Sequence, residues 1–322
     1  MKSIYGIAAA LALLLAGAGA AAQARYPERT VRILVGFAPA GPADIAARLV
    51  ADKLGQSWGK PVVVENVPGA AGNIATERAA KAPPDGHTLI MATSANLIFP
   101  SLFKLAFDPI KDLAPISQVC VAPNMLVVHN EVPARSVAEL VALARARPGM
   151  LTFGSGGVGT TQHLAGELFK SMAALDLRHV PYRGIAAALP DLLAGRLDLA
   201  FGNISAVLPL VREGRLRALA VTSPQRWAAS PDLPTMAESG FPGFDATAWF
   251  GLMAPAPTPA AILAQLHGEI VRIVALPDIR KKFDDVGMAV IGNTPAEFAR
   301  EIALQTPKWA KVIEQAGLKA SE

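Results

Sequence analysis

Short apolar runs alternate with amphipathic segments along most of the chain. Runs at residues 31–37, 61–65 and 88–92 predict strands, and the segments 44–54 and 73–80 between them predict helices. The first run has no polar alternation beyond Arg32, which is typical of a strand buried on both faces of a parallel sheet. This β-α-β-α-β order predicts a parallel sheet with right-handed crossovers.

A second set of elements begins near residue 125. Strands are predicted at 125–129, 151–153, 179–181, 197–201, 216–222 and 248–254. Helices are predicted at 136–146, 161–171, 186–194, 258–274 and 295–316, and Ser136 with Glu139 forms a capping box at the first of them. The pattern is that of an α/β protein, and 322 residues suffice for two domains with hydrophobic cores.

Two places in the pattern are alike. Each has a short strand, 126–128 or 251–253, that leads through a proline to a capped helix. We interpret them as the points where the chain crosses between two lobes and returns, because no low-complexity linker is present and two lobes can be hinged by a pair of strands. This division assigns residues 25–124 and 248–322 to lobe 1 and residues 125–247 to lobe 2.

Composition narrows the class of protein. The chain is 52% apolar and only 17% charged, which excludes a disordered protein. Its net charge of +4 comes from scattered Lys and Arg without a basic run, so no nucleic-acid partner is predicted. The single cysteine, Cys120, stands among Ile116, Val119 and Val121 in a predicted buried strand, where it acts as a small apolar residue and not as a catalytic thiol.

The first residues are typical of an export signal. Lys2 precedes an almost wholly apolar stretch at 4–19, and Ala22-Gln23-Ala24 forms an A-x-A cleavage pattern. A signal peptide at residues 1–24, a mature chain that begins at Arg25 and a location in the periplasm are therefore expected. The alternative is an uncleaved membrane anchor, for which the apolar stretch is long enough.

Three predicted strand-to-helix turns are rich in small residues, at 38–44, 93–96 and 154–161. Ligands of open α/β sheets bind beyond the carboxyl ends of strands, where these turns lie. Small residues such as Gly156 let backbone N–H groups approach a ligand, and a helix N-terminus adds unpaired donors and the positive end of its dipole. The turns can therefore hold an anion without Arg or Lys, although each alone is also explained as an ordinary capped turn.

The third turn also satisfies G-x-G-x-x-G through Gly154, Gly156 and Gly159. A dinucleotide fold wants an acidic residue at the end of the next strand, and Asp176 does not end one, so the nucleotide alternative is weak. The esterase pattern G-x-S-x-G fails because Phe153 occupies its first glycine position.

Metal and acid–base chemistry find little support in the sequence. The five histidines, at positions 87, 129, 163, 179 and 267, show no pair at metal-ligand spacing, and no carboxylate pair stands out. His163 is the only histidine that the sequence places beside a candidate turn. No catalytic residue, cofactor or metal site is predicted.

Many ordered stretches carry a family resemblance. They are Tyr26-Pro27, residues 61–66 with Pro68-Gly69, Asp85-Gly86, residues 154–160 with 163–167, residues 180–182, residues 216–222, and residues 249–251. From Tyr26 to about Leu318 the chain resembles the Bug-type receptors of tripartite tricarboxylate transporters. The resemblance implies a type II periplasmic binding protein fold, with two lobes of mostly parallel sheets joined by two hinge strands. It further implies a receptor, expected as a monomer, that captures a small mono- or dicarboxylate and docks on membrane permease subunits.

The resemblance also implies a ligand carboxylate held in the interlobe cleft by the first and third turns, partly through ordered waters. The expected ligand-binding positions, with Gly156 of the third turn included, are ten: Ala40, Gly41, Asp44, Ser94, Ser155, Gly156, Thr160, Thr161, Tyr182 and Asn203. The chain departs from the family pattern at Pro42 and Ala43, where a backbone N–H and a hydroxyl are missing, and at Gly202, where members often have Asp.

Two other functions remain open at this point. One is a periplasmic sensor that docks on a receptor kinase, which no motif distinguishes from a transport receptor. The other is a periplasmic α/β enzyme that uses Ser155 or His163. Arg183, which follows Tyr182, is the nearest candidate for a cation that would bind the carboxylate in place of the helix N-termini.

Overall fold

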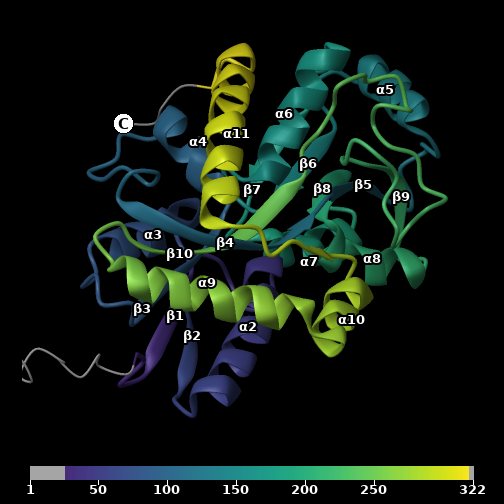
Figure 1. Cartoon of the computed structure of the whole chain (residues 1–322). Coiled ribbons are helices and arrows are strands. Elements are labelled where there is room, and N and C mark those ends of the chain that lie inside the picture. The colour runs from purple at the N-terminus through teal and green to yellow at the C-terminus, as the bar shows by residue number, and fades with distance from the viewer. Residues whose placement is uncertain (1–25, 319–322) are drawn as a thin grey trace, which may run out of the picture.

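The computed structural model describes residues 26–318 and places eleven strands in two sheets (Figure 1). The first sheet has six strands in the order β11-β4-β10-β3-β1-β2. These strands are β1 (Val31–Val35), β2 (Val62–Asn66), β3 (Thr88–Thr93), β4 (Leu113–Ala122), β10 (Ala248–Pro255) and β11 (Ala289–Val290). The expected signal peptide, 1–24, and its cleavage site lie outside the described residues.

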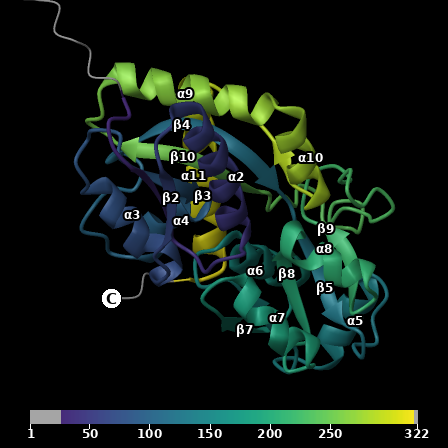
Figure 2. The same cartoon turned by 90° about the horizontal axis from the view of Figure 1, so that it is seen from below.

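The second sheet has five strands in the order β7-β6-β8-β5-β9. They are β5 (Asn124–His129), β6 (Thr152–Ser155), β7 (Arg178–Pro181), β8 (Leu199–Asn203) and β9 (Leu216–Val221). Seen from below, the elements of the two sheets form two halves (Figure 2). The first sheet takes its strands from residues 31–122 and 248–290, and the second from residues 124–221, and we propose that each sheet is the centre of one of the expected lobes.

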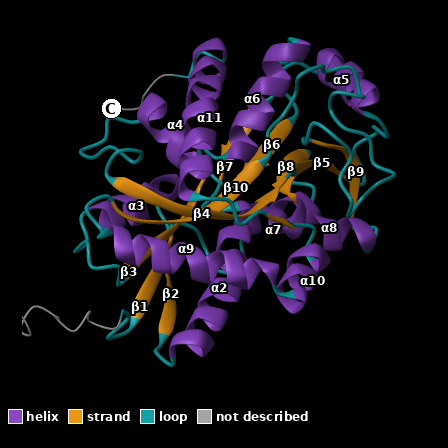
Figure 3. Ribbon diagram, viewed as in Figure 1, coloured by secondary structure: helices purple, strands orange, loops and turns teal. Residues whose placement is uncertain are grey.

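Helices cover both sheets (Figure 3). They are α2 (Pro42–Trp58), the 3-10 turn η2 (Ala70–Gly72), α3 (Asn73–Ala80), α4 (Ala95–Leu102), α5 (Val137–Ala146), α6 (Thr161–Ala173), α7 (Ile185–Leu193), α8 (Ile204–Arg212), α9 (Ala260–Ala275), α10 (Pro277–Asp285) and α11 (Pro295–Gln315). Neighbouring strand residues go to two different apolar clusters, Leu34 and Ile90 to one, Ile33 and Leu89 to the other. Both faces of the first sheet are therefore buried, as its unbroken apolar runs predict.

The sheets are mixed. The expected parallel pairing holds between β1, β2 and β3 and between β6, β7 and β8. In contrast, β10 runs antiparallel to β3 and β4, and β5 runs antiparallel to β8 and β9. The prediction of mostly parallel sheets therefore applies only to the β-α-β units, because β5 and β10 follow a direct chain crossing and not a crossover helix.

The chain crosses between the two sheets just before β5 and just before β10, each of which lies wholly within one sheet. The first crossing is Pro123, between β4 and β5, and the second lies in residues 222–247, between β9 and β10. Buried hydrogen bonds join the crossings: the backbone N–H of Asn124 donates to Thr222 Oγ1 (2.9 Å), and Asn124 Nδ2 donates to the Ala246 carbonyl (2.8 Å). These hydrogen bonds fix the two crossings to each other.

Two further features limit how the halves can move. Helix α11 packs against α4 and also against α6, so it contacts both halves (Figure 1). Trp227, in the second crossing, donates from Nε1 to the Gly287 carbonyl near β11 (2.7 Å).

Cys120 is fully buried in β4, as expected, and burial raises the pKa of its thiol, so it is not a nucleophile at neutral pH.

Within residues 26–318 no single helix is both long and apolar enough to cross a membrane. Only α9 and α10 taken together meet that test, and a bend of 70° separates them.

Candidate functional site

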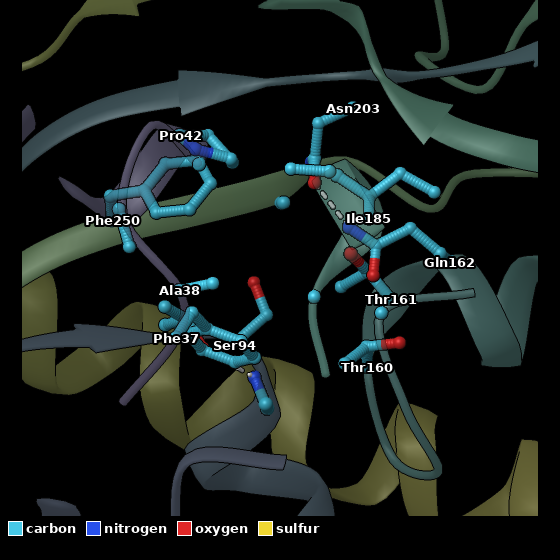
Figure 4. Close-up of a pocket in the computed structure, with 18 residues that line it drawn as sticks. Phe37, Ala38, Pro42, Ser94, Thr160, Thr161, Gln162, Ile185, Asn203 and Phe250 are labelled. Carbon is cyan, nitrogen blue, oxygen red and sulfur yellow. Dashed lines mark hydrogen bonds between the residues drawn. The ribbon is translucent and has the colours of Figure 1, made fainter. Parts of the chain in front are cut away.

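A cavity lies where elements of both sheets meet, and five helices begin at its wall (Figure 4). Its empty volume is about 530 Å³, part of which is open to solvent. The N-cap residues of α2, α4, α6, α7 and α8 all line it: Gly41, Ser94, Thr160, Gly184 and Asn203. Each helix N-terminus carries roughly half a positive charge, so the cavity favours an anion.

Unpaired donors are concentrated on three of these helices. The first N–H groups of a helix have no partner within it, and Ala43 of α2, Thr161 and Gln162 of α6, and Ile185 of α7 all border the cavity. Pro42, at the first position of α2, supplies none. Among the described residues the Thr161 hydroxyl also has no hydrogen-bond partner, whereas the Thr160 hydroxyl caps α6 by accepting from the His163 N–H (3.4 Å).

The first turn is held by the buried carboxylate of Asp44. It accepts from the Ala40 N–H (3.0 Å), from Arg48 Nε (2.9 Å) and from Asn66 Nδ2 (2.9 Å). Burial alone would raise the pKa of Asp44, but these hydrogen bonds together with the Arg48 charge lower it below its ordinary value. Ala40 has a φ of 63°, a left-handed conformation that the bond to Asp44 stabilises. Asp44 therefore shapes the turn from behind and does not face the cavity.

Ser155 has a similar role in the third turn. It is completely buried, and its hydroxyl accepts from the Gly157 N–H (3.1 Å) and lies 2.7 Å from His179 Nε2. Ser155 is not among the residues that line the cavity. A serine beside a histidine suggests a nucleophile, but this hydroxyl is sealed from the cavity and is used to fold the loop, so no observation favours the enzyme alternative.

His163 and His179 lie beneath the same loop. Their rings have centroids 4.1 Å apart, although the sequence suggested that only His163 lies near a candidate turn. The sequence missed His179 because it approaches only through the parallel pairing of β6 and β7, which sets Phe153 opposite His179. Burial and the nearby Lys170 lower the pKa of His179 to about 4, and burial, His179 and Lys170 lower that of His163 to about 3, so both rings are neutral at neutral pH.

Three neutral polar side chains complete the wall. The Ser94 hydroxyl accepts from the Trp249 N–H (2.9 Å), which leaves its own proton for another acceptor, and in Figure 4 its oxygen points into the cavity. Gln162 Nε2 donates to Asn203 Oδ1. The remaining polar atoms of that pair, Gln162 Oε1 and Asn203 Nδ2, are buried and have no partner among the described residues.

Some of the ten expected positions line the cavity and the others lie outside it. Six line the cavity: Gly41, Ser94, Gly156, Thr160, Thr161 and Asn203. Four do not: Ala40, Asp44, Ser155 and Tyr182. The Tyr182 hydroxyl donates to Asp191, and Tyr182 with Arg183 borders a neighbouring hollow that shares Phe37 and Gly156 with the cavity.

Sequence reasoning did not single out the apolar side of the cavity or the start of α7. Phe37, Ile185 and Phe250 line it, together with Gly184 and Gln162. Gly184 has a φ of 111° and stands at the N-terminus of a predicted helix, so it carries the same signal as the three turns that were recognised. The two phenylalanines gave no signal, because an aromatic residue in or beside a buried strand is usually part of the core.

The glycines of the third turn are explained by close packing. A Cβ on Gly154 would lie 2.6 Å from Leu197, and one on Gly156 would lie 3.1 Å from Gln162 Oε1 and 3.2 Å from the Ile185 nitrogen. Gly202 is similarly confined, because a Cβ there would lie 2.4 Å from Val207. The G-x-G-x-x-G spacing thus follows from the loop's packing and gives no support to a nucleotide site.

Within residues 26–318 no three His, Cys, Asp or Glu side chains are grouped as metal ligands.

The walls of the cavity approach each other closely at its rim. A Cβ on Gly184 would lie 3.9 Å from Ala38 Cβ, and one on Gly159 would lie 3.2 Å from Leu102 of α4. Residues from elements of the two sheets therefore lie close to one another beside the cavity.

Comparisons with known proteins agree on the family. Residues 46–318 match the family model described as the tripartite tricarboxylate transporter family receptor. The chain is 36% identical to Protein BugT of Bordetella pertussis over 97% of each chain. It is 35% identical to a UPF0065 protein of Pseudomonas sp. strain P51, over 97% of this chain and 94% of the relative.

Solved structures give the same result. R. palustris Rpa4515, solved with adipate, has a TM-score of 0.89 and 36% identity, and the match covers 92% of this chain and 100% of that one. The periplasmic binding protein BugD has a TM-score of 0.87 and 32% identity over 92% and 100% of the two chains. MatC from Rhodopseudomonas palustris, with bound malate, has a TM-score of 0.84 and 32% identity over 89% and 100%. These likenesses confirm the periplasmic binding protein fold, and this chain belongs to the family of tripartite tricarboxylate transporter receptors.

Proposed function

We propose that this chain is an exported receptor that captures a small organic carboxylate in its cleft and delivers it to the membrane subunits of a tripartite transporter. One observation carries the choice of ligand: five helix N-termini converge on a cavity whose lining includes no charged side chain. A carboxylate bound there receives charge-assisted hydrogen bonds from Ala43, Thr161 and Gln162 backbone N–H groups. The adipate and malate of the two solved relatives support the same class.

The ligand is trapped by closure of the two halves. Donors come from the first half through α2 and α4, and from the second through α6, α7 and α8, so only the closed cleft brings them all to one ligand. The two crossings at Pro123 and residues 222–247 act as the hinge, since the chain passes between the two sheets there and their bonds lie outside the cavity. Closure buries the ligand and strengthens each hydrogen bond by excluding water.

Delivery and location follow from the family. A receptor of a tripartite transporter has to reach the periplasm and then dock on membrane permease subunits, and the N-terminal residues of this chain suit export. Nothing in the proposal requires a cofactor or a chemical step on the ligand.

Native mass spectrometry of the protein purified from a periplasmic fraction tests the proposal, because it identifies any retained ligand. The ligand is expected to be a carboxylic acid. Calorimetry on refolded, ligand-free protein then compares that acid with its own carboxamide, which has the same shape without the charge. The proposal predicts at least 100-fold weaker binding of the amide. Equal binding of acid and amide, or conversion of the ligand to a product, would overturn it.

A further inference from the structure

The cavity offers a ligand no charged side chain. None of the side chains that the structure places around it is Asp, Glu, Lys, Arg or His. Asp44, the nearest acid on α2, is turned toward Arg48 and Asn66 behind the turn. The nearest cation suggested by the sequence, Arg183, borders the neighbouring hollow on the far side of Gly156.

The body of the ligand meets an apolar wall. Phe37, Pro42 and Phe250 stand on one side of the cavity and Ile185 on the other, with space between them (Figure 4). Phe250 and Ile185 are each only 3% exposed, so a group placed between them loses its water. A ring or an alkyl chain gains from this contact, whereas a second carboxylate placed between these apolar side chains would lose its hydration to them.

The polar pair Gln162 and Asn203, beside this wall, does not suit a carboxylate. Gln162 and Asn203 bond to each other and leave one amide oxygen and one amide NH₂ unpaired. In either orientation of the two amides, the pair leaves one acceptor and one donor unpaired. A hydroxyl both donates and accepts and matches this pair, whereas a carboxylate only accepts and would face a bare amide oxygen.

We infer that the ligand is a monocarboxylate with an uncharged, mainly apolar body, in which a ring or alkyl chain lies between Phe250 and Ile185 and a neutral group such as a hydroxyl meets the Gln162–Asn203 pair. The inference rests on the proposed function and narrows its ligand. It differs from a direct transfer of adipate or malate from the solved relatives, since both of those have two carboxylates.

Matched pairs of acids test the inference by calorimetry on refolded, ligand-free protein. Hexanoate and adipate have the same chain and differ by one carboxylate, as do 4-methylbenzoate and terephthalate. The expected result is at least 10-fold tighter binding of the monocarboxylate in at least one pair, with neither pair reversed. Benzoate and 4-hydroxybenzoate test the polar pair, and the hydroxy acid is expected to bind more tightly.

A charge variant gives an independent readout. Ile185→Lys places a cation in the apolar wall and is expected to shift the adipate-to-hexanoate ratio toward adipate by at least 10-fold, whereas Leu304→Lys, on the exposed side of α11, leaves it unchanged. Thermal unfolding of each variant verifies that it is folded.

The outcomes separate the two claims. Tighter binding of adipate or terephthalate than of its partner, especially if Arg183→Ala removes the preference, overturns the inference and leaves the proposed carboxylate receptor standing. If no acid of either class binds and the protein retains a ligand without a carboxylate, both claims are wrong.

Discussion

The Ser155 hydroxyl lies 2.7 Å from His179 Nε2, at the base of the loop that forms one wall of the cavity. Because Ser155 is completely buried and also accepts from the Gly157 N–H, we expect the pair to fix the loop and not to contact the ligand. The family resemblance assigned Ser155 to the ligand itself, so this geometry changes what its substitution is expected to do.

Ser155→Ala should therefore lower stability as well as affinity. It leaves the buried Gly157 N–H and His179 without their shared partner, which costs on the order of 1–3 kcal/mol of unfolding free energy. Thr161→Val is the contrasting variant, because the Thr161 hydroxyl is unpaired in the structure and lines the cavity. It should weaken ligand binding by about 10-fold with little change in stability. Urea unfolding and calorimetry on both proteins measure the two effects, and equal stability loss in both would contradict the assignment.

The neighbouring rings of His163 and His179 predict a pH dependence of folding. Their pKa values of about 3 for His163 and about 4 for His179 lie below the ordinary value near 6.5, so the unfolded chain binds more protons between those limits. Stability should be fully present above pH 6.5 and fall as the pH drops from 6.5 toward 4. The charged groups that face this pair are Glu167 and Lys170, which bond to each other.

Replacing His179 by Gln removes one titrating ring and keeps a side chain that can bond to Ser155. The slope of unfolding free energy against pH should then become shallower between pH 6.5 and 4, by up to about 1.4 kcal/mol per pH unit in its steepest part. His267→Gln, on α9 away from this loop, serves as the control for the loss of a histidine elsewhere in the chain. An unchanged slope in His179→Gln would show that His179 is not held neutral.

Asp44→Asn should loosen the first turn. The amide has one acceptor oxygen in place of two, so it cannot accept from Ala40 and Arg48 and also from Asn66, and it loses the charge that pairs with Arg48; the loss is expected to be on the order of 1–3 kcal/mol. Because the pKa of Asp44 is lowered, the wild-type contribution is present above its ordinary value near 3.9 and is lost as the pH falls through the folded value. Asp52→Asn, exposed on the same helix, is the matched control for chemical denaturation. Equal losses in the two variants would rule out a special role for Asp44.

The hinge bonds can be tested with two threonines of the same segment. Thr222→Val removes the hydroxyl that accepts from the buried Asn124 N–H, and it should cost on the order of 1–3 kcal/mol. Thr247→Val is isosteric in the same way, but the described residues offer its hydroxyl no partner, so it should be close to neutral. Denaturation midpoints compare them, and a larger loss from Thr247→Val would contradict the hinge assignment.

Periodicity and turn chemistry predicted most of the fold. The apolar runs located β1, β3, β6, β8 and β9 because buried strands have a local signature. The antiparallel pairing of β5 and β10 could not be predicted, since pairing direction depends on where the chain crosses between sheets. The short strand β11 and the helices α4, α8 and α10 were not predicted, because short elements fixed by tertiary packing carry little local pattern.

The site was predictable to the extent that it is made of turns. Gly41, Thr160 and Thr161 stand at helix starts with clear sequence signals and line the cavity. Ser155 and Asp44 have the same local signals but point away from the cavity. Only their hydrogen bonds in the structure show that these two residues support the turns and do not line the cavity. Phe250 and Ile185 reach the cavity from distant parts of the chain, which no local pattern encodes.

The central claim is that helix N-termini, and not a cationic side chain, hold the ligand carboxylate. Calorimetry with the identified ligand on Gly156→Val and Arg183→Ala tests it most directly, with thermal unfolding to verify that both are folded. A side chain at 156 meets Gln162 Oε1 and the Ile185 nitrogen and blocks the approach to α6 and α7, so Gly156→Val should lose at least 100-fold in affinity. Arg183→Ala should bind within about threefold of the wild type, since Arg183 lies outside the cavity, a change of about 0.7 kcal/mol at most. Loss of binding in Arg183→Ala together with normal binding in Gly156→Val would contradict the account.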